Sequence, residues 1–299
     1  MKKVLKWLGI AVVAVIAVIM IAVIAMYAVS SFRINKSYDI AVEQVPVGAD
    51  EETLARGEHI AATRGCEDCH KQGYAGGLFI DGGPLATLYS SNLTAGRGGI
   101  GSTYTDADWV RAIRHGVGPD GKPLLFMPAQ EYYYLSDEDL GALIAYMKTV
   151  PPVDNTVAES SVGPLGRALF LAGQFPLLPV EMVDHTAPRP VAPEPGVTAE
   201  YGQYMAYGCM GCHNPNFTGG PITGGDPSWP PAANLTPAGP LADYTEEQFI
   251  ETMRSGLTPS GKQLNAEWMP WPTAAQMTDE ELQAVWLFFN SLPATPTEG

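Results

Sequence analysis

Basic side chains are scarce in this sequence of 299 residues, which has 17 Lys and Arg against 32 Asp and Glu. Five of the basic residues surround an apolar N-terminal run, namely Lys2, Lys3, Lys6, Arg33 and Lys36. The rest of the chain therefore has 12 basic and 32 acidic residues, a net charge of −20. So negative a chain excludes nucleic acid as a ligand, repels anionic membrane surfaces, and either attracts a basic protein partner or serves solubility alone.

Cysteine is also scarce. All four cysteines lie in two short runs, Cys66–His70 and Cys209–His213, which both read C-x-x-C-H. On a helix the two sulfurs of C-x-x-C share one face, so each pair, Cys66 with Cys69 and Cys209 with Cys212, can form thioethers to the two vinyl groups of one porphyrin. His70 and His213 then present their imidazoles to iron from the proximal side. The pattern predicts two covalently bound haem c groups.

Other uses of C-x-x-C compete with this interpretation. A zinc site, a disulfide and a thioredoxin-like redox pair can each explain the cysteines. None of them explains why histidine follows immediately in both runs, and the redox pair also needs a βαβ pattern that the sequence lacks. The repeated histidine therefore favours haem.

Methionine supplies the candidates for the second axial ligand. Met127 lies 61 residues after Cys66, and Met269 lies 60 residues after Cys209. Both precede proline, which restricts the loop backbone and cannot extend a helix. Most methionines fill cores, but this parallel favours Met127 and Met269 as iron ligands.

The parallel is part of an internal repeat with an offset near 142 residues. The repeated segments are Asn92-Leu93-Thr94 with Asn234-Leu235-Thr236, Tyr104-Thr105 with Tyr244-Thr245, and Ser136–Leu140 with Thr278–Leu282. The Thr and Ser residues are good helix N-caps, and each Asn-Leu-Thr is interpreted as a structural turn rather than a glycan acceptor. Each copy thus reads as a helix entering C-x-x-C-H, a glycine-rich wrap, a middle helix, a methionine loop and a closing helix, with no convincing run of strands.

The N-terminal apolar run, Trp7 to Val29, has 23 uncharged residues. As a helix it would span roughly 35 Å, enough for a hydrocarbon core of about 30 Å. A cleaved signal peptide is the alternative, but its apolar region is usually only about 7 to 15 residues long. The lysines before the run predict a cytoplasmic N-terminus, with the remainder exported.

With these motifs in place, the chain resembles the c-type cytochromes, specifically tandem dihaem cytochromes that act as membrane-tethered electron carriers or as haem subunits of membrane-bound dehydrogenases. The resemblance covers roughly residues 50–150 and 198–293. It implies a mainly α fold, with an N-terminal transmembrane helix (1–36), a first cytochrome c domain (37–152), a proline-rich linker (153–197) and a second cytochrome c domain (198–299).

The resemblance also implies a function. It implies His/Met ligation of both irons and electron transfer, without catalysis by the chain itself, between respiratory or photosynthetic partners on the outer face of a bacterial cytoplasmic membrane. The expected partners are redox proteins, either a basic soluble carrier or a larger membrane complex of which the chain is a subunit. A catalytic dihaem enzyme such as a cytochrome c peroxidase is the alternative; it would need two dissimilar haem sites, whereas the two copies here are nearly equivalent.

The sequence also predicts the location or role of several other residues. Trp109 and Phe249 occupy matching places on the middle helices and are expected in the cores. Arg114 and Arg254 match as well; each is expected at the surface, with a haem propionate as a possible partner. The remaining histidines are expected to be structural: His59, His115 and His185.

Overall fold

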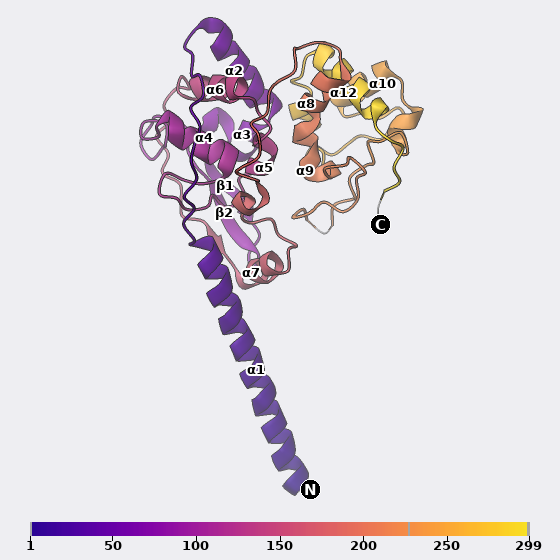
Figure 1. Ribbon diagram of the computed structural model, residues 1–299. Coiled ribbons are helices and arrows are strands. Elements are labelled where there is room, and N and C mark those ends of the chain that lie inside the picture. Colours follow the sequence, from indigo (N-terminus) through magenta and orange to yellow (C-terminus); the bar gives the residue numbers. More distant parts are fainter. Residues whose placement is uncertain (1, 227, 298–299) are drawn as a thin grey trace.

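A computed structural model of the chain describes residues 2–226 and 228–297. The fold is mainly helical, as predicted: one long N-terminal helix leads into two helical domains that lie side by side (Figure 1). The last two residues of the predicted second domain, 298 and 299, lie outside the described residues.

The long helix α1 (Lys2–Ile34) contains the whole apolar run and extends beyond it. It is long and apolar enough to cross a membrane, and its central window is not buried by the rest of the chain. Near its C-terminal end, Ser30 is fully buried and accepts a bond from Arg167 of the linker. The expected anchor is therefore one continuous helix whose C-terminal end packs against the globular part of the chain.

Domain I is built on a crossing of two helices. Its helices are α2 (Glu51–Thr63), α3 (Cys66–His70), α4 (Asp106–His115), α5 (Ala129–Tyr132) and α6 (Asp137–Met147), with the 3₁₀ turn η1 (Gln72–Tyr74). Gly57 of α2 lies so close to the carbonyl of Ala142 on α6 that a Cβ would collide with it. Because that close approach needs glycine, Gly57 fixes the crossing, and the core around Ile60, Trp109 and Leu143 forms beneath it.

Domain II repeats this scaffold. Its elements are α8 (Ala199–Ala206), η3 (Tyr207–Cys209), α9 (Met210–His213), η4 (Pro240–Asp243), α10 (Glu246–Ser255), α11 (Trp271–Ala274) and α12 (Asp279–Ser291). Gly202 of α8 meets the carbonyl of Ala284 on α12 in the way that Gly57 meets Ala142. Phe217, Phe288 and Phe289 form its aromatic core together with the expected Phe249.

The predicted caps form in both domains. Thr105 and Thr245 each accept from the backbone N–H three residues on and complete a capping box, while Ser136 and Thr278 cap the closing helices. The predicted Asn-Leu-Thr turns are confirmed: Asn92 Oδ1 accepts from Thr94 N and Oγ1 at 3.0 and 2.9 Å, and Asn234 makes the same bonds to Thr236 at 2.9 and 2.7 Å. All four of these side chains are buried, where a glycan could not be attached.

A small sheet in domain I was not expected from the sequence. Strands β1 (Gly77–Asp81), β2 (Ala86–Ser90) and β3 (Ser161–Val162) pair antiparallel in that order, with an irregularity between Leu78 and Ile80. The strands are short, and β3 comes from the linker, so their pairing depends on a contact far along the chain. Periodicity within a window of five residues is too weak a signal to reveal it.

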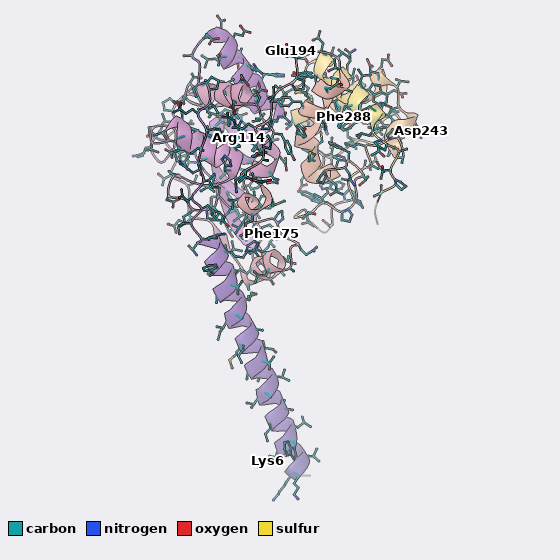
Figure 2. The ribbon with its side chains drawn as sticks, viewed as in Figure 1. Lys6, Arg114, Phe175, Glu194, Asp243 and Phe288 are labelled. Carbon is teal, nitrogen blue, oxygen red and sulfur yellow. The ribbon has the colours of Figure 1, made fainter. Side chains whose placement is uncertain are left out.

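The linker does not stand between the domains but packs on domain I. After β3 it forms α7 (Pro164–Leu171) and η2 (Pro179–Met182). Phe170, Phe175, Leu177 and Val180 make a third core with the β-hairpin and with Val117; Figure 2 labels Phe175 in this layer. The linker therefore acts as a cover for domain I.

The two domains meet through polar and aromatic contacts. Tyr134 of domain I stacks on Tyr207 of domain II with ring centroids 4.0 Å apart. Tyr204 accepts a bond from Ser136 N at 3.0 Å and donates to Asp139. His59 lies 2.8 Å from Glu281. These contacts hold the domains in one arrangement.

Candidate functional site

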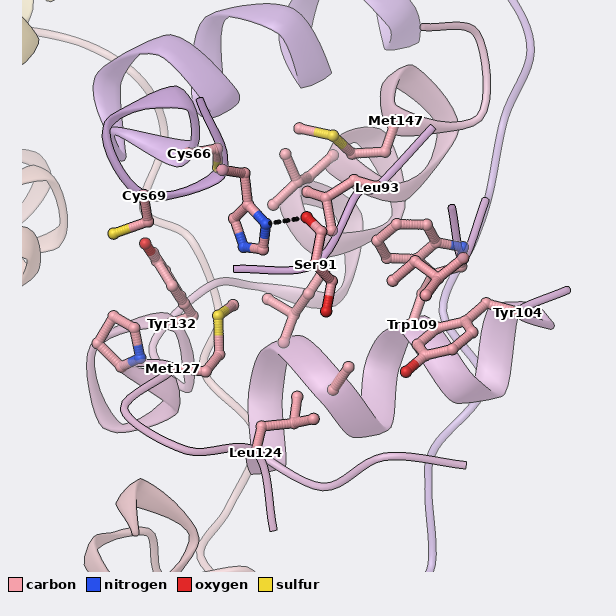
Figure 3. Close-up of a pocket in the computed structure, with 16 residues that line it drawn as sticks. Cys66, Cys69, Ser91, Leu93, Tyr104, Trp109, Leu124, Met127, Tyr132 and Met147 are labelled. Atoms are coloured by element: carbon pink, nitrogen blue, oxygen red, sulfur yellow. Dashed lines mark hydrogen bonds between the residues drawn. The ribbon is translucent and has the colours of Figure 1, made fainter. Parts of the chain in front are cut away.

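Domain I contains a cavity that encloses about 710 Å³ of empty space, including part that is open to solvent. Figure 3 shows its walls, which are almost wholly apolar. The lining includes four predicted site residues, namely Cys66, Cys69, His70 and Met127.

The two cysteines are carried by the short helix α3. The chain reaches it through Gly65, and Cys66 and Cys69 then lie one turn apart. Burial raises the pKa of the Cys66 thiol to about 12 and that of Cys69 to about 11. Redox-active and zinc-binding cysteines instead have lowered pKa values, because the thiolate is the reactive form. The environment does not favour a thiolate here.

His70 is oriented by a backbone bond. Its Nδ1 lies 2.8 Å from the carbonyl oxygen of Ser91, so Nδ1 carries the proton and donates it (Figure 3). Nε2 is then left with its lone pair free in the wall of the cavity, which is the tautomer that metal-ligating histidines need. Burial also lowers the pKa of His70, so that the ring stays neutral.

Met127 reaches the same cavity from a loop that the linker supports. Figure 3 shows its sulfur pointing into the cavity. The preceding Phe126 has a φ of 62°, which is uncommon for a bulky residue. Phe126 N donates to the carbonyl of Leu177 in the linker at 2.9 Å. The linker thus holds the backbone conformation from which Met127 enters the cavity.

The cavity fits a haem better than it fits zinc. Leu93, Ile113 and Leu143 supply a dry apolar wall, and the indole Nε1 of Trp109, also in the lining, is buried with no hydrogen-bond partner among the described residues. Such a donor suits a ligand with acidic groups of its own. Within residues 2–226 and 228–297, no three His, Cys, Asp or Glu side chains gather as a metal-ion site would need.

Domain II places its predicted residues in equivalent local settings. Cys209 ends η3 and Cys212 lies in α9, and burial raises the thiol pKa of both, to about 11 for Cys209. His213 is buried, and its Nδ1 lies 2.7 Å from the carbonyl of Ala233, as His70 does with Ser91. Met269 precedes Pro270 and the short helix α11, just as Met127 precedes Pro128 and α5. The repeat therefore extends to the orientation of the histidine.

The two C-x-x-C-H motifs lie on facing sides of the domain boundary. Arg64, just before the first motif, donates to the carbonyls of Met205 and Tyr204 at 3.0 and 3.2 Å, and its charge offsets part of the rise that burial causes in the thiol pKa of Cys66 and Cys209. Glu131 on α5 lies against Gly211, inside the second motif, where a Cβ would collide with the carboxylate.

Glu131 is a functional candidate that sequence reasoning missed. Burial raises the pKa of its carboxyl to about 7. Its charge raises the thiol pKa of Cys69, Cys209 and Cys212, so it lies near both motifs. Nothing in the sequence marks this residue, because the closeness arises only when the domains pack together.

The expectation for Arg114 needs correction. Arg114 is fully buried, where Nη1 pairs with Glu43 and with Asp137 and Nη2 donates to Leu135 O at 2.8 Å; Figure 2 labels it inside domain I. The surface location expected for it is wrong. Arg254 is partly exposed and pairs with Asp279 at 2.7 Å. Both arginines are committed to protein partners.

The other three histidines, which the sequence predicts to be structural, contact protein groups. His59 pairs with Glu281 across the domain boundary. The Nδ1 atoms of His115 and His185 lie 2.9 Å apart, and His185 Nε2 donates to Val180 O at 2.9 Å. This pair fastens the linker to domain I.

Comparisons with known proteins agree with this geometry. Residues 52–147 match the family model described as cytochrome C oxidase, cbb3-type, subunit III, and residues 199–293 match the model described as cytochrome c. Together these matches cover more than half of the chain.

Several curated proteins are similar over much of the chain. The cytochrome c subunit of a quinone-type alcohol dehydrogenase from Gluconacetobacter polyoxogenes is 31% identical over 86% of this chain and 59% of its own length. The gluconate 2-dehydrogenase cytochrome c subunit of Pantoea cypripedii is 37% identical over 56% of this chain and 39% of its own length. A diheme cytochrome c-type protein of Cereibacter sphaeroides is 28% identical over 83% of this chain and 91% of its own length. The chain thus spans less than two thirds of the length of the two dehydrogenase subunits.

Proposed function

Because the chain belongs to the c-type cytochromes and has two covalently bound haem c groups, we propose that it is a membrane-anchored relay that passes single electrons between redox partners. The observation that carries this proposal is that the two C-x-x-C-H motifs face each other across the domain boundary, where Arg64 donates to the last turn of α8 and Glu131 lies against Gly211. When bound, each haem supplies a one-electron iron centre whose potential depends on its axial ligands.

The site residues have distinct roles in this proposal. Cys66 with Cys69, and Cys209 with Cys212, would form the thioethers. His70 and His213 would hold iron through Nε2, since Nδ1 of each is engaged by a backbone carbonyl. Met127 and Met269 would supply the second ligands. Two protein ligands for each iron would leave no place for a substrate, which argues for electron transfer rather than catalysis.

The interface keeps the two sites at a fixed separation. The guanidinium of Arg64 ties the chain just before the first motif to the last turn of α8, which leads into the second motif. The Tyr134–Tyr207 stack and the bonds of Tyr204 fix the same boundary from the α5 side. A rigid boundary of this kind would keep the electron-transfer distance constant.

The proposed location is the outer face of a cytoplasmic membrane. The lysines before the apolar run of α1 favour a cytoplasmic N-terminus, which exports both domains. The related dehydrogenase subunits support a place in a larger complex that would deliver electrons to this chain. The charge of −20 beyond α1 would attract a basic partner as donor or acceptor.

A redox-titrated absorbance spectrum of the full-length protein tests this function. Two haems per chain are expected, together with the weak near-infrared band that a methionine sulfur gives to ferric haem. Met127→Leu and Met269→Leu should each remove about half of that band. A wild-type band at half strength would mean dissimilar sites and would favour a peroxidase-like enzyme instead.

Purification in mild detergent separates a free carrier from a subunit. A chain that elutes with other proteins after gentle extraction supports membership of a complex. Elution alone, at its own mass plus the micelle, would contradict a stable complex and leave the relay as a free carrier.

A further inference from the structure

Helix α7 in the linker is apolar on two opposite sides. Its inner side places Gly166 and Phe170 in the third core. Its outer side carries Leu165, which is 47% exposed, and the exposed Ala168 one turn further on. The residues that the structure describes leave this outward apolar side largely uncovered.

Charge is nearly absent from this part of the linker. Between Val162 and Val180 the only charged residue is Arg167, and its guanidinium is turned toward α1 rather than outward. An exposed surface of a chain with 32 acidic residues would normally carry some of them. The outer side of α7 is therefore unlike the rest of the protein surface.

Helix α7 lies against the outer end of α1. Arg167 Nη1 donates to Ser30 Oγ at 2.7 Å and to Ser31 Oγ at 3.0 Å, and its guanidinium lies 4.7 Å from the centre of the Tyr27 ring. From the other side, Arg33 lies 4.0 Å from the centre of the Phe170 ring. Figure 1 shows α7 at the end of the globular part from which α1 departs.

These contacts fix the depth of α7 relative to the bilayer. The apolar run of α1 ends at Val29, so Tyr27 to Ser31 mark the level where hydrocarbon gives way to headgroups. A tyrosine and an arginine at that level are typical of the membrane interface. Because Arg167 joins α7 to these residues, α7 lies at the same level.

We propose that α7 is a second membrane contact, a helix that lies in the interface of the lipid bilayer with Leu165 and Ala168 toward the acyl chains. The inference rests on the anchoring of the chain by α1. It is supported by the outward apolar side, by the missing charge and by continuity with the membrane-spanning helix. Domain I is then seated on the membrane at two points instead of hanging from one helix.

Photo-crosslinking to lipid tests this contact on the full-length protein with its haems. The protein is reconstituted into vesicles of phosphatidylcholine, a lipid without net charge, because α7 has no outward charge and the chain beyond α1 is strongly acidic. The photoreactive residue p-benzoylphenylalanine replaces Leu165 or Ala168, and mass spectrometry measures the phospholipid adduct. Ala266, an exposed alanine in domain II, is the matched control, and Val18 in the middle of α1 reports the anchor.

The expected result is lipid adduct at positions 165 and 168 that exceeds the adduct at position 266 by about tenfold. Adduct at 18 with no excess at 165 and 168 would overturn the interfacial role of α7 while leaving the anchor intact. Crosslinks from 165 to protein instead of lipid would assign the surface to a partner and overturn the proposal as well. No adduct at 18 would overturn the anchor and this inference together.

Discussion

The two domains share one scaffold but differ in what covers it. Val117 of domain I and Leu257 of domain II follow equivalent middle helices and make equivalent backbone bridges. Val117 is fully buried under the linker, whereas Leu257 is 46% exposed. The methionine loop of domain I is likewise covered, and that of domain II is largely open. The repeat thus specifies the haem-binding frame, and the sequence outside the repeat decides how far each frame is covered.

Removal of the matched arginines should give the largest difference in stability between the two domains. Arg114→Met would leave Glu43 and Asp137 without their buried partner and should lower the free energy of unfolding by about 3–5 kcal/mol. Arg254→Met removes a partly exposed pair and should cost about 0–1 kcal/mol. Thermal unfolding, with hydrogen exchange to assign the loss to α4 or α10, measures both. Equal losses of unfolding free energy in the two variants would show that the burial of Arg114 does not make domain I respond differently from domain II.

The shared scaffold should respond equally in both copies. Gly57→Ala and Gly202→Ala each force a methyl group against a backbone carbonyl of the closing helix and should cost about 1–3 kcal/mol. Gly9→Ala is the control, because a Cβ there meets nothing within 4 Å. The same unfolding measurement applies. A loss of stability in only one of these two variants would show that the two helix crossings are not equivalent.

The carboxyl between the motifs should make the reduction potentials depend on pH. Burial raises the pKa of Glu131 to about 7, so the group is neutral below that pH and negative above it. A nearby negative charge favours the ferric state, and the potentials should therefore fall by tens of mV between about pH 6 and pH 8. Spectroscopic redox titrations at both pH values measure the shift.

Glu131→Gln should abolish this pH dependence while leaving both haem spectra intact. Glu267→Gln, which changes an exposed carboxylate of domain II, should leave the pH dependence as it is in the wild type. If the reduction potentials of Glu131→Gln depended on pH as they do in the wild type, another group would be responsible for that dependence.

The predictable parts of this molecule were those encoded locally or by repetition. The capping residues, the Asn-Leu-Thr turns and the apolar anchor each depend on a few neighbouring residues, and the structure has them as predicted. The haem-ligand assignments of Met127 and Met269 came from matching spacings in the two copies, and they stay predictions until the spectra are measured.

The parts that could not be predicted all depend on contacts far along the chain. Arg114 is buried because Glu43, from the segment before α2, lies over it. The sheet depends on two residues of the linker. Glu131 gains its raised pKa only where the second domain closes over α5. Local patterns do not encode such contacts, so the sequence predicts a surface position for Arg114 and a glycine-rich wrap in place of the sheet, and it does not mark Glu131.

The position of the linker in the chain has a consequence for biosynthesis. Synthesis runs from the N-terminus, and domains fold as their residues appear. The residues that line the first cavity, from Cys66 to Met147, are made before Leu177 and Val180, which belong to the cover. The cysteines and the histidine of the first site therefore emerge before Leu177, whose carbonyl accepts from Phe126 N and holds the loop that carries Met127.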